Sequence, residues 1–192
     1  MIYKHYFIEQ NITNINENLI LFHGENLGFI KEIKEKISSK HKNAEVIKFF
    51  QEDLIKNPNI FFRELNNISL FEKNKIFYID QVNDKITELI NEIKEIEISN
   101  KIFLFADVLE KKSKVRNLFE KSKMCASIAC YPDNEISIKN IINNKLKTFD
   151  GLDENVVTLI LKNSNLDRIK LNNELSKIVT YFYNKKINIE EL

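Results

Sequence analysis

Short apolar runs alternate with helically spaced apolar positions along most of the chain. The runs cover residues 18–24, 44–50, 75–82, 101–107 and 124–131. They are rich in Ile, Phe and Leu, as is typical of strands buried on both faces. Between them, apolar residues recur three or four positions apart, as in the stripe from Leu27 to Ile37, which predicts amphipathic helices. Strand and helix alternate five times, so we expect an α/β fold with a parallel five-stranded sheet and flanking helices.

After Pro132 the pattern changes, because only helical spacing follows. Apolar stripes over residues 138–146, 156–160 and 171–182 predict three amphipathic helices. Asp153 is expected to cap the second of these helices at its N-terminus. The sequence therefore predicts an α/β domain over residues 1–134 and a small helical domain over residues 135–192.

Composition narrows the class of protein. The 192 residues are 43% hydrophobic, and 29 Lys and Arg against 28 Asp and Glu give a net charge of +1. This balance is typical of a folded globular protein and gives no strong field to attract nucleic acid. No apolar run approaches the roughly 20 residues that cross a bilayer, and the start MIYKHYFIEQ lacks a secretory signal. We therefore expect a cytoplasmic protein that does not associate with membranes.

The cysteines and histidines predict neither a disulfide nor a metal site. Cys125 and Cys130 are five residues apart in one apolar run, so an extended strand would place them on opposite faces as small buried residues. His5, His23 and His41 lie in unrelated segments, and we expect surface or turn positions for them. No Ser/His/Asp or Cys/His combination can be assigned to common loops. We therefore expect no catalytic residues and no enzymatic activity of the chain itself.

The turn after the first apolar run, HGENLGFI, lies where an α/β sheet commonly binds a nucleotide. A phosphate-binding loop needs a lysine and a hydroxyl residue at its end. Phe29 and Ile30 stand in those places, and Glu25 adds a negative charge. Asp80 ends the third run but is followed by glutamine, so the acidic residue that would activate water is missing. We expect no nucleotide or metal cofactor, and Asp80 is interpreted as a strand-end or capping carboxylate.

Two large apolar residues, Leu70 and Phe71, lie in the otherwise polar segment NNISLFEKNK. One interpretation is that both side chains fold back under the sheet. The other is an exposed hydrophobic anchor for a partner's pocket, since a few apolar residues often supply most of the binding energy of an interface.

A basic segment containing Lys111, Lys112, Lys114 and Arg116 is predicted to open the helix that starts near Glu110. A solvated helix face accounts for these charges. Contact with DNA phosphates is the alternative, and such contact would make affinity fall steeply as salt rises. An active nucleotide hydrolase with an unusual phosphate loop is a further alternative function.

Four stretches carry a resemblance to a known family: LILFHGENLGFIKE, NISLFEKNKIFYIDQV, KIFLFADVLEKKSKVRNLFEK and LDRIKLNNELSKIVTYF. In order and spacing, over essentially the whole chain, they resemble the delta subunit of the bacterial DNA polymerase III clamp loader. The resemblance implies an AAA+-type fold with a helical lid, and a scaffold that has lost its phosphate loop. It also implies a role in DNA replication as a non-catalytic subunit of a nucleotidyltransferase holoenzyme.

Ser69, Leu70 and Phe71 match a family motif position by position. In the family this loop presents a Leu-Phe pair to a hydrophobic pocket of the sliding clamp, the beta subunit, and springs open one of its interfaces. The resemblance therefore implies that Leu70 and Phe71 are exposed anchors for the clamp.

The chain departs from the family in one respect. Family members carry a third, helical collar domain that joins them to the motor subunits and the delta-prime subunit, and this sequence ends before it. Assembly with those subunits, and indirectly with primed DNA, is therefore expected only where a collar is present. Clamp contact is expected to survive, because its residues lie in the first domain.

Overall fold

The computed structural model describes residues 1–4, 8, 12, 15–67 and 74–192. The chain divides into two compact units. The first comprises Met1–Glu25 and Ile30–Tyr131, and we call it the α/β unit. The second comprises Asn26–Phe29 and Pro132–Leu192, and we call it the helical unit.

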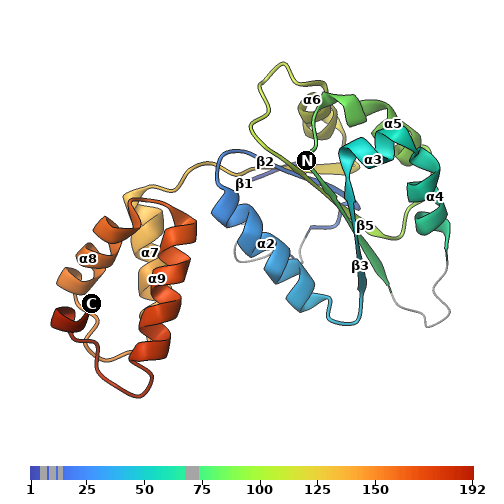
Figure 1. Cartoon of the computed structure of the whole chain (residues 1–192). Helices are drawn as coiled ribbons and strands as arrows, with labels where there is room; N and C mark the ends of the chain where they lie inside the picture. The colour runs from blue at the N-terminus through green and yellow to red at the C-terminus, as the bar shows by residue number, and fades with distance from the viewer. Residues whose placement is uncertain (5–7, 9–11, 13–14, 68–73) are drawn as a thin grey trace. The chain divides into compact units, whose positions relative to one another are not determined.

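A six-stranded parallel sheet forms the centre of the α/β unit (Figure 1). The strands are β1 (Ile2–Lys4), β2 (Leu19–His23), β3 (Glu45–Phe50), β4 (Lys75–Asp80), β5 (Lys101–Ala106) and β6 (Cys125–Ala129). Their order across the sheet is β1-β6-β2-β5-β4-β3. Strand β2 therefore lies inside the sheet, between β5 and β6, and β3 lies at one edge.

The expected parallel α/β sheet is confirmed, but the predicted number of five strands is wrong. The additional strand β1 pairs in parallel with β6, where Ile2 lies opposite Ser127. The amino group of Met1 donates hydrogen bonds to the carbonyl oxygens of Ser122, at 3.0 Å, and of Cys125. Three residues at an exposed edge carry too short an apolar pattern to be recognised, so this strand depends on backbone pairing that the sequence does not reveal.

Helices cover both faces of this sheet. They are α2 (Leu27–Lys40), α3 (Gln51–Lys56), α4 (Pro58–Asn66), α5 (Thr87–Lys94) and α6 (Lys114–Lys121), with a short 3-10 helix η2 (Asp84–Ile86) before α5. Helix α2 lies against one face, while α3 to α6 lie against the other (Figure 1). Pro58 occupies the first turn of α4, where its missing N–H costs nothing, so the apolar pattern between β3 and β4 forms two helices, α3 and α4.

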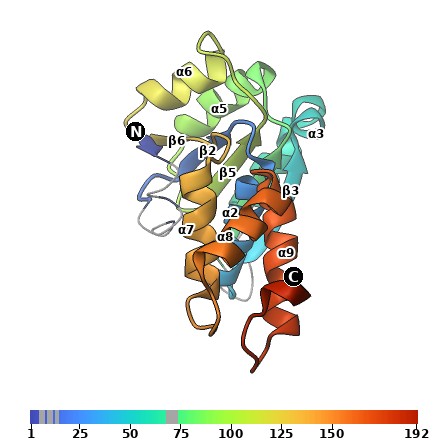
Figure 2. The ribbon, with the colours of Figure 1, turned by 90° about the vertical axis from the view of Figure 1, so that its left-hand side faces the viewer.

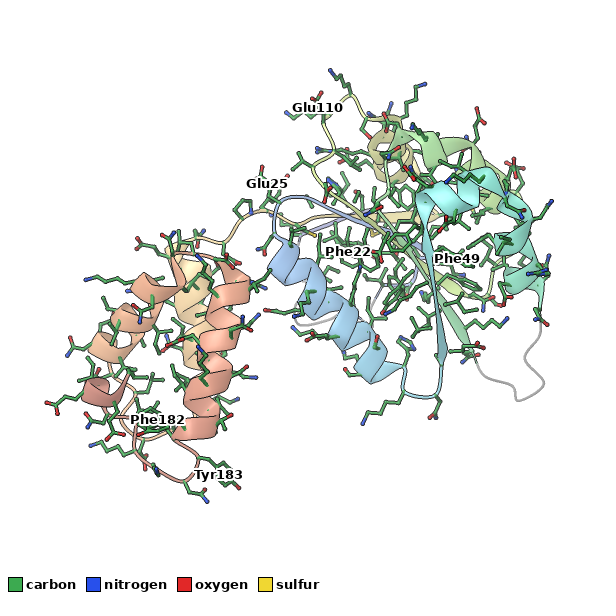
Figure 3. The ribbon with its side chains drawn as sticks, viewed as in Figure 1. Phe22, Glu25, Phe49, Glu110, Phe182 and Tyr183 are labelled. Atoms are coloured by element: carbon green, nitrogen blue, oxygen red, sulfur yellow. The ribbon has the colours of Figure 1, made fainter. Side chains whose placement is uncertain are left out.

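The core lies on both faces because successive strand residues alternate between them. Leu21, Phe77 and Leu104 pack with residues of α3 to α6 on one face. On the other face, aromatic rings meet: Phe22 stacks on Phe105 with ring centroids 5.6 Å apart, and Tyr78 contacts Phe105 edge-on at 5.3 Å. Figure 3 labels Phe22 and Phe49 within this sheet.

The helical unit contains the three predicted amphipathic helices, α7 (Glu135–Leu146), α8 (Glu154–Ser164) and α9 (Arg168–Tyr181), followed by a 3-10 turn η3 (Ile189–Glu191). They lie side by side around an apolar core (Figure 2). The carboxylate of Asp153 accepts a hydrogen bond from the Val156 N–H at 2.9 Å, which confirms the predicted cap of α8. Phe182 closes this core, whereas the neighbouring Tyr183 is 72% exposed (Figure 3).

Both cysteines are buried, as predicted, and neither is in a disulfide bond. Burial raises the pKa of the Cys125 thiol above its usual value. Among the residues that the structure describes, no helix is both long and apolar enough to cross a bilayer.

Candidate functional site

The predicted clamp anchor, Ser69, Leu70 and Phe71, lies outside the described residues. The structure does describe the two ends of the connection that contains it, because α4 ends at Asn66 and β4 begins at Lys75. We call these two ends the base of the 68–73 segment.

Hydrogen bonds fix this base on the α/β unit. The Nζ of Lys75, whose side chain is buried, donates to the carbonyl oxygen of Glu64 at 2.9 Å and to its carboxylate at 3.3 Å. The Asn74 carbonyl accepts from the Glu45 N–H at 2.9 Å, and Asn100 donates its side-chain amide to the Lys75 carbonyl at 3.2 Å. The last turn of α4 and the start of β4 are therefore tied together, so the 68–73 segment begins and ends at a defined place.

The base lies at the end of the sheet formed by the N-termini of the parallel strands. A connection from a helix into a strand enters at the amino end of that strand, whereas the turn from β2 into α2 leaves a carboxyl end. In an open parallel sheet, nucleotides bind outside the carboxyl ends of the strands. The base of the 68–73 segment and the turn after β2 therefore lie at opposite ends of the parallel strands.

The turn after β2 is closed by its neighbours in the α/β unit. Gly24 has a φ of +141°, and a Cβ at this position would lie 2.3 Å from the carbonyl oxygen of Cys130. Its N–H donates to the Asp107 carbonyl at 3.2 Å, while the His23 carbonyl accepts from the Cys130 N–H at 2.7 Å. Close approach of two backbones thus requires glycine here, and these backbone groups already have partners within the protein.

The first turn of α2 is capped within the helical unit. The Oδ1 of Asn26 accepts a hydrogen bond from the Phe29 N–H at 2.9 Å, and its Nδ2 donates to the Asp133 carboxylate at 2.8 Å. Gly28 permits close packing, because a Cβ there would lie 2.7 Å from the Cβ of Arg168. The guanidinium of Arg168 also lies over the Phe29 ring, 5.2 Å from its centroid.

Asp133 and Arg168 form a buried ion pair, with side chains only 1% and 2% exposed. The carboxylate accepts from Arg168 Nε at 2.7 Å and Nη2 at 2.8 Å, and from the Ser137 hydroxyl at 2.9 Å. Burial alone would raise the pKa of Asp133, but the hydrogen bonds from Arg168, Asn26 and Ser137 and the charge of Arg168 bring that pKa below its usual value. A protein carboxylate, therefore, is the anion held beside the cap of α2.

This arrangement does not fit a nucleotide phosphate. The Asn26 side chain already caps α2, the aspartate lies next to that cap, and Glu25 is exposed on the turn itself (Figure 3). Anions are favoured at a helix N-terminus when its N–H groups are free to bind them. Here the Asn26 side chain takes one of those groups, and the Arg168 guanidinium is already paired with the Asp133 carboxylate.

Asp80 is neutralised by a cation of the protein. It lies at the end of β4 and forms an ion pair with the Lys34 ammonium from α2. The same ammonium lies 4.2 Å from the centroid of the Phe105 ring. Among the described residues, no group of three His, Cys, Asp or Glu side chains is placed to hold a metal ion.

The interpretation of His23 as a surface or turn residue is wrong. Its side chain is only 3% exposed, because β2 pairs on both sides as far as His23, opposite Ala106 and Ala129. Burial, and then the charge of Arg116, lowers the pKa of His23 to about 4, so this ring is neutral at pH 7. The continuous apolar run before His23 was the signal that the strand includes it.

The predicted start of the basic helix near Glu110 is also wrong. Helix α6 begins at Lys114, because the Ser113 hydroxyl accepts from the Arg116 N–H at 3.2 Å and so caps the helix. Lys111 and Lys112 lie in the turn before this helix, directly after Glu110, which is labelled in Figure 3. The Ser-Lys-Val-Arg sequence therefore marks the start of α6, and the lysines before Ser113 do not belong to the helix.

The four predicted basic residues do not share one face. Lys112 pairs with Glu110 at 3.0 Å, and both side chains are exposed. Arg116 is half-buried, and it donates to Glu120 at 2.8 Å and to the Leu109 carbonyl at 2.9 Å. Arg116 therefore stabilises the loop before α6, and it is not a free phosphate ligand.

Comparison with known proteins gives a likeness of structure only. No family model matches the chain, and no curated protein matches its sequence. A solved structure, the delta protein of the Bacillus subtilis DNA clamp loader, matches with a TM-score of 0.64 and 11% identity over 95% of this chain. The chain has a clamp-loader delta-like fold. It spans 59% of the length of the Bacillus subtilis protein.

Within this clamp-loader delta-like fold, sequence reasoning missed the pairs Asp133–Arg168 and Lys34–Asp80. The dipeptides that contain Asp133 and Arg168, Pro-Asp and Asp-Arg, lie 35 positions apart. No local periodicity relates such residues. The only signal was that Arg168 falls in a stretch, LDRIKLNNEL, that carries the family resemblance.

Proposed function

We propose that this protein acts in sliding-clamp loading during DNA replication, as a subunit that binds the clamp and does not hydrolyse ATP. The clamp-loader delta-like fold, which extends over 95% of the chain, is the observation that carries this proposal. The turn after β2 supports it, because its residues are used for packing and capping where an active ATPase would bind phosphate.

Leu70 and Phe71 are the proposed anchor for a hydrophobic pocket of the clamp. The fixed base at Glu64 and Lys75 supports this role, since a short connection with fixed ends loses less conformational freedom on binding. For the ring to open, the anchor must bind the opened interface better than the closed one, because a partner shifts an equilibrium only by its difference in affinity.

Assembly with motor and delta-prime subunits is a further part of the proposal. In the family those contacts use the collar domain, and the present chain corresponds to 59% of the Bacillus subtilis protein. Clamp binding is therefore the step that this chain can be tested for directly.

The test is a titration of the chain with the sliding clamp of the same organism, in which binding is measured by calorimetry or fluorescence anisotropy. The double variant Leu70→Ala with Phe71→Ala should lose about 2–4 kcal/mol of binding free energy, or roughly 30- to 1000-fold in Kd.

A matched control is Ile136→Ala with Tyr183→Ala, since both of these side chains are 72% exposed and belong to the helical unit. The control should bind the clamp like the unmodified chain. Equal affinities for the anchor variant and the unmodified chain would remove the assignment of Leu70 and Phe71.

A further inference from the structure

A shallow groove lies between helices α5 and α6 of the α/β unit, which are neighbours in Figure 1. Its volume is about 610 Å³. The residues that line it come from both helices and the position after α6: Thr87, Lys94, Lys114, Asn117, Leu118, Lys121 and Ser122. All of them lie within one unit and within the described part of the chain.

Three lysines border this groove and no acidic residue lines it. Lys114 and Lys121 are seven residues apart, which is about two helical turns, so they share one face of α6. Lys94 is the last residue of α5. Among the described residues, none of these three ammonium groups forms an ion pair with a carboxylate.

Two carboxylates close in sequence to the groove residues are already engaged. Asp84 accepts hydrogen bonds from the Ser113 hydroxyl at 2.6 Å and from the Val115 N–H at 3.1 Å, and the charge of Lys114 contributes to the lowered pKa of that aspartate. Glu120 pairs with Arg116. The groove therefore has an excess of positive charge that the fold does not neutralise by direct pairing.

The floor of the groove is apolar. Leu118 lies midway between Lys114 and Lys121 on α6, is only partly buried, and packs against the core of the sheet. Lysine side chains also present their methylene groups to such a surface while the ammonium stays in water. The groove thus offers an apolar contact between cationic groups.

We propose that the groove between α5 and α6 binds an acidic peptide segment of a partner protein that carries a large apolar side chain. Carboxylates would pair with Lys94, Lys114 and Lys121, while the apolar side chain would cover Leu118. A nucleic-acid backbone would satisfy the lysines but offers no apolar group for the floor. The proposal rests on residues of α5 and α6 alone, and it does not depend on clamp binding.

The experiment uses a fluorescein-labelled peptide in which one phenylalanine is flanked by aspartates, and measures anisotropy with the full chain. The variant Lys94→Gln, Lys114→Gln, Lys121→Gln should weaken binding about tenfold or more, since three ion pairs are lost. The matched control is Lys111→Gln, Lys112→Gln, Lys123→Gln, which removes the same charge at exposed positions outside the groove. This control should change the Kd by less than about twofold.

A second measurement needs no variant. Excess peptide should protect Lys94, Lys114 and Lys121 of the unmodified chain from acetylation, as read by mass spectrometry, while Lys111, Lys112 and Lys123 stay reactive.

Several outcomes overturn the proposal: absence of binding at millimolar peptide, equal weakening in both triple variants, or equal protection of all six lysines. Undiminished affinity for a peptide with serine in place of phenylalanine also contradicts it, because the apolar floor would then play no part. A single-stranded oligonucleotide that binds more tightly and displaces the peptide would assign the groove to nucleic acid.

Discussion

The first turn of α2 and the end of β4, on the one hand, and the groove between α5 and α6, on the other, use charged residues in opposite ways. Beside the cap of α2, Asp133 accepts hydrogen bonds from three different side chains, and at the end of β4 Asp80 is paired with Lys34. In the groove, Lys94, Lys114 and Lys121 have no ion-pair partner among the described residues. Asp133 and Asp80 therefore form ion pairs within the protein, whereas the lysines of the groove remain available to a partner.

The strongest way to break this contrast is Arg168→Met. Removing the guanidinium leaves the carboxylate of Asp133 buried without its cation, so the variant should lose about 3–5 kcal/mol of unfolding free energy. Urea unfolding followed by circular dichroism measures the loss. The double variant Arg168→Met with Asp133→Leu should recover part of it, because no unpaired charge remains. A single variant as stable as the unmodified chain would show that the pair is not structural.

Gly24→Ala tests whether the turn after β2 is closed by its backbone. The φ of +141° and the contact of the added Cβ with the Cys130 carbonyl both oppose a side chain, so we expect a loss of about 2–4 kcal/mol in the same unfolding assay. Glu25→Ala, at the exposed neighbouring position, is the control and should change stability by less than about 0.5 kcal/mol. A turn open enough for phosphate would instead tolerate both changes alike.

The pH dependence of stability sharpens the comparison at His23. The pKa of this residue is about 4 in the folded protein against an ordinary value of 6.5, so the unfolded chain binds more protons between these values. The His23 contribution is therefore complete above pH 6.5 and is lost as pH falls, with a decrease of about 2 kcal/mol between pH 7.5 and 5. Urea midpoints of the unmodified chain and of His23→Gln should converge over this range. Parallel pH curves would mean that the pKa of His23 is the same in the folded and the unfolded chain.

The smallest effect is expected at Lys112. Its ion pair with Glu110 is exposed to solvent, where side-chain entropy and screening offset the attraction. Lys112→Gln should change the unfolding free energy by less than about 0.5 kcal/mol, and Glu110→Gln should do the same. A loss above 1 kcal/mol in either variant would contradict this expectation and would mean that the ion pair stabilises the turn before α6.

Continuous apolar runs and helical stripes were sufficient to predict the parallel sheet and the three helices after Pro132. Those features depend on which positions are buried, and the spacing of apolar residues along the chain indicates such positions without knowledge of the tertiary structure. Strand β1 and the start of α6 were missed because they depend on hydrogen bonds made by Met1 and Ser113. His23 was misplaced because its burial depends on strands on either side of β2.

The candidate site divides in the same way. Leu70 and Phe71 were identified from two apolar residues in a polar segment and from a family motif, and their role stays a prediction. The Asp133–Arg168 pair joins residues that only tertiary folding brings together, so no spacing rule points to it. The placement of Lys94 beside Lys114 and Lys121 could not be predicted for the same reason, since these lysines belong to different helices.

Burial of both native thiols has a practical consequence for every binding experiment proposed above. Cys125 and Cys130 are 0% exposed and not in a disulfide, and burial makes the Cys125 thiol harder to ionise, so the folded chain should react only slowly with maleimides. A single cysteine introduced at an exposed position such as Glu25 would then carry one dye or spin label per molecule, without removal of the native residues. The fold thereby allows site-specific labelling with little background in the binding experiments proposed above.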